Sequence, residues 1–159
     1  MDDRRRKARG SRGEFPSIRQ GVAGDAAAVR PLLGQLGYDL EEPEIERRIA
    51  RIAGAAGHCL LVAEDNEGRP VALLHVFGRA ALEKPPEAVV QALVVRDGVR
   101  RRGLGRAMMA LAEKWAVEQG YRYISLGSQV GREQAHAFYR RLGYERYATS
   151  HQFRKSIEA

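Results

Sequence analysis

The chain has 159 residues, of which 44% are hydrophobic and 30% are charged, and its formal net charge is +7. This length fits one domain with one core, and no apolar run approaches the ~20 residues that a membrane span needs. No apolar signal segment opens the chain, so we expect a cytoplasmic protein. A single cysteine, Cys59, excludes an intrachain disulfide.

Much of the positive charge lies at the N-terminus. Residues 1–13 contain six basic and two acidic side chains, so they carry +4 and the rest of the chain only +3. Because this stretch has no apolar periodicity, we expect residues 1–14 to be a disordered basic tail and residues 15–159 to form one domain. A solvated tail is the simplest interpretation, and a nucleic-acid partner is not expected.

Residues 15–20 are a weak candidate for the first strand, and Asp25 is a plausible N-cap for the helix that follows. Gly37 is expected to end this helix, and Pro31 inside it predicts a kink or a break. The apolar positions follow an i, i+3, i+4, i+7 pattern: Val29, Leu32, Leu33 and Leu36. A second helix is predicted from Pro43 to its stop at Gly54.

The pattern then changes to extended chain. Residues 58–64 and 70–77 flank a four-residue turn and predict an antiparallel hairpin. A valine-rich strand over residues 88–96, a helix over 104–118 and a strand over 121–126 predict a right-handed crossover between two parallel strands. A last helix over residues 132–142 ends at Gly143, and residues 144–155 are expected to supply one or two closing strands.

A glycine-rich turn between the valine-rich strand and the next helix contains Arg100-x-x-Gly103-x-Gly105. The first turn of a helix has free N–H groups and partial positive charge, so it can bind an anion such as a pyrophosphate. A dinucleotide fold would need a third glycine where Met108 stands, and a P-loop would need Lys-Ser or Lys-Thr where Arg106-Ala107 stands. Neither of these alternatives fits.

This turn resembles the Arg/Gln-x-x-Gly-x-Gly/Ala acetyl-CoA signature of the GNAT acetyltransferase superfamily. The resemblance extends to residues 132–144, which are similar to the family's Ala-x-x-Phe-Tyr-x-x-x-Gly-Phe/Tyr helix. It implies an α/β fold with a mixed central sheet of about six to seven strands, about four helices, and a splayed pair of parallel strands around the cofactor.

The resemblance also implies which residues bind acetyl-CoA. The backbone of Leu93, Val94 and Val95 would pair with the pantetheine arm. The pyrophosphate would lie against the glycine-rich turn, made of Arg100, Arg101, Arg102, Gly103, Leu104, Gly105 and Arg106. Arg132 is a further candidate for cofactor binding. Tyr139 would lie beside the thioester sulfur, where a phenol, protonated at neutral pH, can donate a proton to the departing thiolate.

The general base is less well defined. Several relatives carry a glutamate on the strand before the signature, but Val89 occupies that position here. Glu87 and His75 are substitutes, and proton loss through water without a single base is the third alternative. A catalytic metal is not expected, because the four histidines are scattered without ligand spacing.

The function expected from these features is direct transfer of the acetyl group of acetyl-CoA to a primary amine of a small molecule. Acidic residues between positions 39 and 46 favour a cationic acceptor, although helix-dipole stabilisation also explains several of them. The alternatives are acetylation of a protein N-terminus or lysine, and a module that binds acetyl-CoA without turnover. A homodimer is a further expectation.

Overall fold

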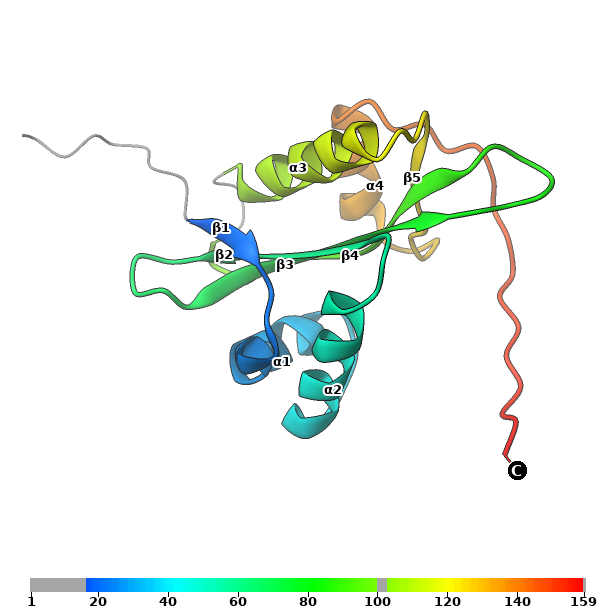
Figure 1. Cartoon of the computed structure of the whole chain (residues 1–159). Helices are drawn as coiled ribbons and strands as arrows, with labels where there is room; N and C mark the ends of the chain where they lie inside the picture. Colours follow the sequence, from blue (N-terminus) through cyan, green and yellow to red (C-terminus); the bar gives the residue numbers. More distant parts are fainter. Residues whose placement is uncertain (1–16, 100–102, 159) are drawn as a thin grey trace, which may run out of the picture. The chain divides into compact units, whose positions relative to one another are not determined.

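The computed structural model describes residues 17–99 and 103–158 (Figure 1). The chain divides into two compact units, Met1–Gly127 and Ser128–Ala159. The first contains the sheet and the first three α-helices, and the second contains the last helix. A single domain over residues 15–159 stays a prediction.

The sheet of the first unit has five strands in the order β1-β2-β3-β4-β5. Their bounds are Ile18–Gln20 (β1), His58–Glu64 (β2), Pro70–Arg79 (β3), Glu87–Val95 (β4) and Ile124–Leu126 (β5). Neighbours are antiparallel except β4 and β5, which are parallel. The predicted hairpin and the predicted parallel pair are therefore confirmed.

Helices cover both faces of this sheet. The 3₁₀ turn η1 (Ala23–Asp25) leads into α1 (Ala26–Gln35) and α2 (Glu42–Ala53), which lie on one face, while α3 (Leu104–Glu118) lies on the other (Figure 1). Leu32 and Ile45 pack with Leu73 and Val94 in the buried cluster of the first face. In the second unit, α4 spans Glu133–Arg141. Across the described residues, no helix combines the length and apolarity that a membrane crossing needs.

The expected number of strands is too high. Over the described residues the sheet has five strands, and residues 144–158, which were expected to supply closing strands, form neither strand nor helix. Tyr147, Phe153 and Ile157 in this segment are 76%, 95% and 92% exposed. A strand is stable only when a neighbour satisfies its backbone and buries one face. Residues with strand propensity therefore form no strand here.

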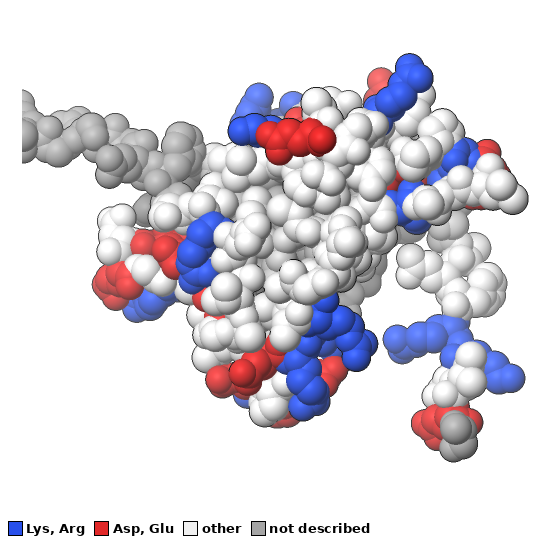
Figure 2. Space-filling model, in the orientation of Figure 1, with Lys and Arg blue, Asp and Glu red and all other residues white. Residues whose placement is uncertain are grey.

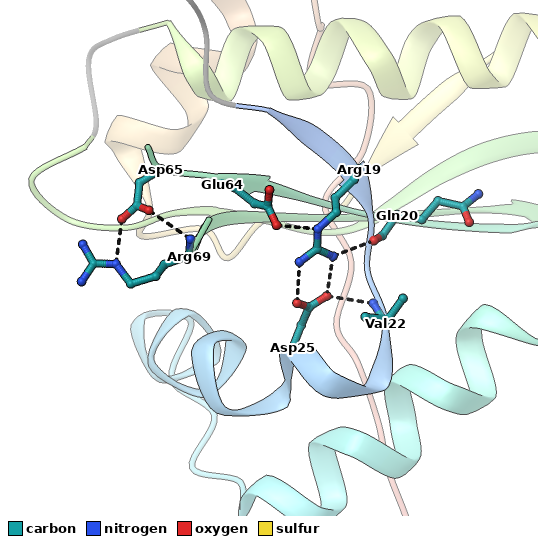
Figure 3. Close-up of polar contacts among 7 residues, drawn as sticks. All are labelled: Arg19, Gln20, Val22, Asp25, Glu64, Asp65 and Arg69. Atoms are coloured by element: carbon teal, nitrogen blue, oxygen red, sulfur yellow. Dashed lines mark hydrogen bonds and ion pairs between the residues drawn. The ribbon is translucent and has the colours of Figure 1, made fainter. Parts of the chain in front are cut away.

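Asp25 precedes α1 as predicted, but its carboxylate does not cap that helix. It accepts hydrogen bonds from the Arg19 guanidinium at 2.7 and 2.9 Å and from the Val22 N–H at 2.8 Å (Figure 3). Arg19 also donates to Glu64 of β2, so the three side chains connect the edge strand to the turn before α1. Asp25 pairs with Arg19 instead of capping α1 because its carboxylate is buried, and an unpaired charge in a buried position would be costly.

Of the kink or break expected at Pro31, the break is not found, because α1 continues through it to Gln35. The kink stays a prediction. Proline removes one N–H from the helix, which leaves the carbonyl of Ala27 without its usual donor. Both residues are exposed. Water can therefore hydrate that carbonyl, so the helix tolerates the loss.

Candidate functional site

The two parallel strands separate after a short contact. Pairing between β4 and β5 covers only three positions, and its last pair joins Val90 to Leu126. On its other side β4 stays paired with β3, but the register shifts so that Gln91 is an extra residue between the pairs His75–Ala92 and Val76–Val90. A bulge bends its strand. Residues 91–94 therefore have no strand partner on the β5 side within the described chain.

The residues predicted to hold the pantetheine lie in this separated part of β4. Leu93, Val94 and Val95 are paired with β3, and Val94 is 4% exposed in the core under α1 and α2. Since these side chains belong to the two faces of the sheet, a ligand along the strand edge would meet the backbone. This arrangement fits an extended, amide-containing ligand.

Gln35, at the end of α1, binds the backbone next to the signature turn. Its Nε2 donates to the Val95 carbonyl at 3.1 Å, and its Oε1 accepts from the Asp97 N–H at 3.0 Å. Sequence analysis missed this residue, because its partners are about 60 positions away and nothing in the local pattern distinguishes it from a surface glutamine. Gln35 holds the chain at the point where β4 ends and the loop to α3 begins.

The start of α3 has the geometry of an anion site. Gly103 is the N-cap with φ of 76°, a conformation that favours glycine, and the helical ladder begins with the Ala107 N–H donating to its carbonyl at 3.0 Å. The amides of the first turn precede this ladder. Leu104 is 2% exposed, so its side chain anchors the turn and only its backbone can serve a ligand.

The remaining residues of the predicted pyrophosphate site fall into two groups. Gly105 is half-buried in the first turn of α3, and Arg106 is exposed beside it. Arg100, Arg101 and Arg102 lie outside the described residues. The described part of the turn fits a pyrophosphate, because a positive helix end, a glycine without a Cβ and a cationic side chain occur together.

Glu87, one of the two candidate bases, lies at the start of β4 and is 6% exposed. Its Oε1 accepts hydrogen bonds from Arg79 and from Lys84. Burial alone would raise the pKa of this carboxyl, but hydrogen bonds from Lys84, Arg79 and Ser125 outweigh it and hold the pKa at about 2. The carboxylate is thus strongly held in its charged form and has little tendency to take up a proton.

His75, the other candidate base, lies in the middle of β3 opposite Ala92. Its Nε2 is 3.0 Å from Nδ1 of His58, the first residue of β2. Burial, with a smaller contribution from the nearby His58, lowers the pKa of His75 to about 4. His75 is therefore a neutral imidazole at physiological pH, with one ring nitrogen able to accept a proton.

Tyr139 lies on α4, in the second unit. Its ring makes edge contacts with Phe138 and Tyr144, with centroids 5.1 and 6.0 Å apart. Burial raises the pKa of its phenol, and the positive charge of Arg132 opposes that shift. Tyr139 is consequently a protonated donor at neutral pH. Arg132 is exposed and precedes the helix as its N-cap residue.

The acidic side chains around α2 are partly neutralised by neighbouring arginines. Glu44 binds Arg47 and Arg48, and Glu41 binds Arg30 at 3.2 Å. Figure 2 shows basic and acidic side chains side by side over the α1–α2 part of the first unit. Because exposed pairs of this kind cancel each other's field, the charge argument for a cationic acceptor is weaker than the sequence suggests.

No group of three or more potential metal ligands occurs within residues 17–99 and 103–158. The described site consists of a strand edge, a helix N-terminus and separate groups that can exchange protons.

Comparison with known proteins identifies the family. Residues 28–144 match the model of the acetyltransferase (GNAT) family. The chain is 31% identical over 147 residues to an aminoglycoside N(6')-acetyltransferase type 1 of Stenotrophomonas maltophilia, and the match covers 90% of this chain and 95% of that protein.

Solved structures agree with this assignment. A putative acetyltransferase from Agrobacterium tumefaciens str. C58 superposes with a TM-score of 0.77 at 26% identity, covering 87% of this chain and 99% of that chain. The aminoglycoside N-acetyltransferase AAC(6')-Iy, determined in complex with CoA, has a TM-score of 0.80 at 19% identity and covers 92% and 98%. The chain therefore belongs to the acetyltransferase (GNAT) family and is an acetyl-CoA-dependent N-acetyltransferase.

Proposed function

We propose that this enzyme acetylates a primary amine of a small molecule, with amino sugars of the aminoglycoside class as the first acceptors to test. The observation that carries the proposal is the match to an aminoglycoside N(6')-acetyltransferase over 95% of that protein's length. The match covers 90% of this chain, so it extends well beyond the cofactor signature.

In the proposed mechanism, bound acetyl-CoA supplies the activated acetyl group. The backbone of Leu93, Val94 and Val95 holds the pantetheine arm along β4, and the first turn of α3 holds the pyrophosphate. The separation of β4 from β5 after Val90 and the left-handed Gly103 support these two roles. Fixing the thioester in one position converts the reaction with a bound amine into an effectively unimolecular step.

Tyr139 is proposed as the donor to the departing thiolate. The resemblance of its helix to the family's Phe-Tyr segment supports this role, and so does burial, which raises the pKa of the phenol. A protonated donor is useful at this step because negative charge develops on sulfur as the thioester bond breaks.

The test is thiol release from acetyl-CoA across a panel of aminoglycosides, polyamines, amino acids and peptides. Turnover that is greatest with a small amine is the expected result. Preference for a peptide N-terminus or lysine would replace this proposal with protein acetylation. Binding of acetyl-CoA without release in the presence of any amine would indicate a module without turnover.

We also propose a homodimer and a cytoplasmic location. The position of β5 at the end of the sheet supports the dimer, since its outer edge has no strand partner among the described residues and can accept one from a second copy. Light scattering after size-exclusion chromatography tests the stoichiometry, and a monomer at micromolar concentration would contradict it.

A further inference from the structure

Two histidines on neighbouring strands form a hydrogen-bonded pair. His58 Nδ1 and His75 Nε2 are 3.0 Å apart, and the rings stack with centroids separated by 5.2 Å. Phe77 stacks on His58 at 5.3 Å and contacts His75 at 6.0 Å. The three rings thus hold one another in a fixed orientation. His58 is exposed, whereas His75 is half-buried.

The pair lies beside the point where β4 leaves β5. His75 is opposite Ala92, which directly follows the bulged Gln91, and the last β4–β5 pair is at Val90. Opposite residues in an antiparallel pair point to the same face. Side chains two positions apart on a strand share a face, and the pair two positions along, Leu73 and Val94, belongs to the core under α1 and α2. His75 therefore faces the α1–α2 side of the sheet, one strand away from the β4 edge proposed to hold the pantetheine.

Neither histidine forms an ion pair with a charged side chain of the described chain. None of the ion pairs recorded among the described residues includes either imidazole ring. The next charged groups on this face of β3 and β4 are Arg79 and Glu87, which are bound to each other. The hydrogen bond thus joins a half-buried imidazole to an exposed one, which is an arrangement suited to moving a proton outward.

We propose that His75 accepts the proton that the acceptor amine loses and that His58 conducts it to solvent. This inference rests on the proposed function. His75 Nδ1 takes a proton from the bound ammonium while His75 Nε2–H passes its own to His58 Nδ1, and His58 Nε2–H releases one to water. The nitrogen then attacks the thioester and the C–S bond breaks. Sulfur receives the proposed Tyr139 proton, the second proton of the nitrogen replaces it on the phenol, and the balance is R–NH₃⁺ + acetyl-S-CoA → R–NH-acetyl + CoA-SH + H⁺.

Burial and exposure explain the division of roles. An imidazolium at His75 is unfavourable, because burial and the neighbouring ring lower its pKa to about 4. Passing the proton on in the same step avoids that charged state, and the exposed His58 carries the charge where water solvates it. His75 is thus the catalytic residue of the pair, and His58 is a positioning and relay residue.

The test compares the pH profiles of His58→Gln and wild type with the best amine of the panel. Glutamine can accept the His75 hydrogen bond but cannot carry a proton, so we expect kcat to fall by about tenfold or more. The acid limb of kcat/KM should move to higher pH, because removing the His58 charge raises the pKa of His75. An acid limb and kcat equal to those of wild type would overturn the relay.

A second variant separates chemistry from folding. His75→Ala should lower kcat by about 10²–10⁴-fold, and millimolar imidazole in the buffer should restore part of the activity, which a purely structural residue would not allow. His151→Gln, at an exposed position of the C-terminal segment, is the matched control and should leave both limbs unchanged. Absence of imidazole rescue in a folded His75→Ala variant would overturn the role of His75.

The outcomes also distinguish this inference from the proposed function. If the wild-type enzyme acetylates small amines and the pH profile of His58→Gln is unaltered, the relay is rejected and the proposed function stands. Wild-type enzyme that releases no thiol with any small amine removes both.

Discussion

At the residue scale, Glu87 shows how a buried carboxylate can stabilise the fold instead of acting as a base. Glu87→Gln should destabilise the protein by roughly 1–3 kcal/mol at pH 7, a range that allows for the partial exposure of Arg79 and Lys84. Because the folded pKa of about 2 lies below the ordinary value of 4.5, this contribution is complete above pH 4.5 and is lost as the pH falls toward 2.

Urea unfolding at pH 7 and pH 3 measures this effect. The difference between Glu87→Gln and wild type should shrink at the lower pH, while Glu83→Gln, an exposed carboxylate in the loop before β4, should match wild type at both. A difference that is independent of pH would mean that the ion pairs contribute nothing and that only packing is lost.

Gly78 of β3 is required for the close approach of Tyr121. A Cβ at this position would lie 1.7 Å from the Tyr121 hydroxyl oxygen and 2.5 Å from Cζ, so Gly78→Ala must displace the ring or the strand. We expect a loss of about 1–3 kcal/mol, measured by thermal or urea unfolding. Gly34→Ala is the control, because a Cβ there meets nothing within 4 Å and should stabilise α1 by about 0.5–1 kcal/mol. Equal stability of the two variants would be inconsistent with this account.

Tyr139→Phe tests the proposed donor, since it keeps the ring and removes the hydroxyl. We expect kcat to fall by about 10²–10⁴-fold with little change in acetyl-CoA affinity, because the hydroxyl acts mainly as charge develops on sulfur. Tyr147→Phe, at a residue that is 76% exposed, is the matched control. Near-normal kcat in the Tyr139 variant would make it a packing residue only.

At the element scale, the start of α3 has two structural requirements, a left-handed residue and accessible amides, which a short glycine-rich segment meets. Gly103 adopts a left-handed conformation, and the following turn must leave its amides accessible. A buried Leu104 fixes that turn to the core, so the amides point in a constant direction. The helix itself supplies partial positive charge at this end.

Gly105→Glu should abolish binding of acetyl-CoA while leaving the fold largely intact. The new side chain would fill the space proposed for the pyrophosphate, and its carboxylate would repel the phosphates. Isothermal titration with CoA measures the loss. Ala110→Glu puts the same charge on an exposed position of the same helix and should bind CoA normally. Unchanged affinity in folded Gly105→Glu would exclude this turn as the phosphate site.

At the scale of the whole molecule, the cofactor is expected to stabilise the native state. A ligand that binds only the folded protein adds about 2.7 kcal/mol at 100 times its Kd, which corresponds to a rise in Tm of roughly 5–10 °C for a chain of this size. Differential scanning fluorimetry with acetyl-CoA measures this shift, which should decrease with salt.

Removing residues 1–13 should leave this shift unchanged and turnover within about twofold of wild type, because no residue of the signature lies there. A melting curve that does not respond to millimolar acetyl-CoA would contradict the proposed cofactor site. A response that disappears only in the truncated chain would assign cofactor binding to the tail.

Local sequence patterns were sufficient to predict the helices and strands that are specified by neighbouring residues. The bounds of β2 and α3 agree with the predicted ranges 58–64 and 104–118, because strand and helix periodicity, with a glycine at the end, specify them without distant contacts. The signature and the Phe-Tyr helix likewise indicated the family, which the comparison confirmed.

Contacts between distant segments decided the rest. Residues 145–158 have strand propensity but join no strand of the described chain. Asp25 binds Arg19 and not the helix it precedes, and Gln35 reaches a strand end about 60 residues away. The hydrogen bond between His58 and His75 depends on the register of β2 against β3. The helix or strand propensity of a segment indicates which structure it forms when another segment packs against it. Strand pairing, burial and the resulting pKa values depend on which segments the tertiary structure brings together.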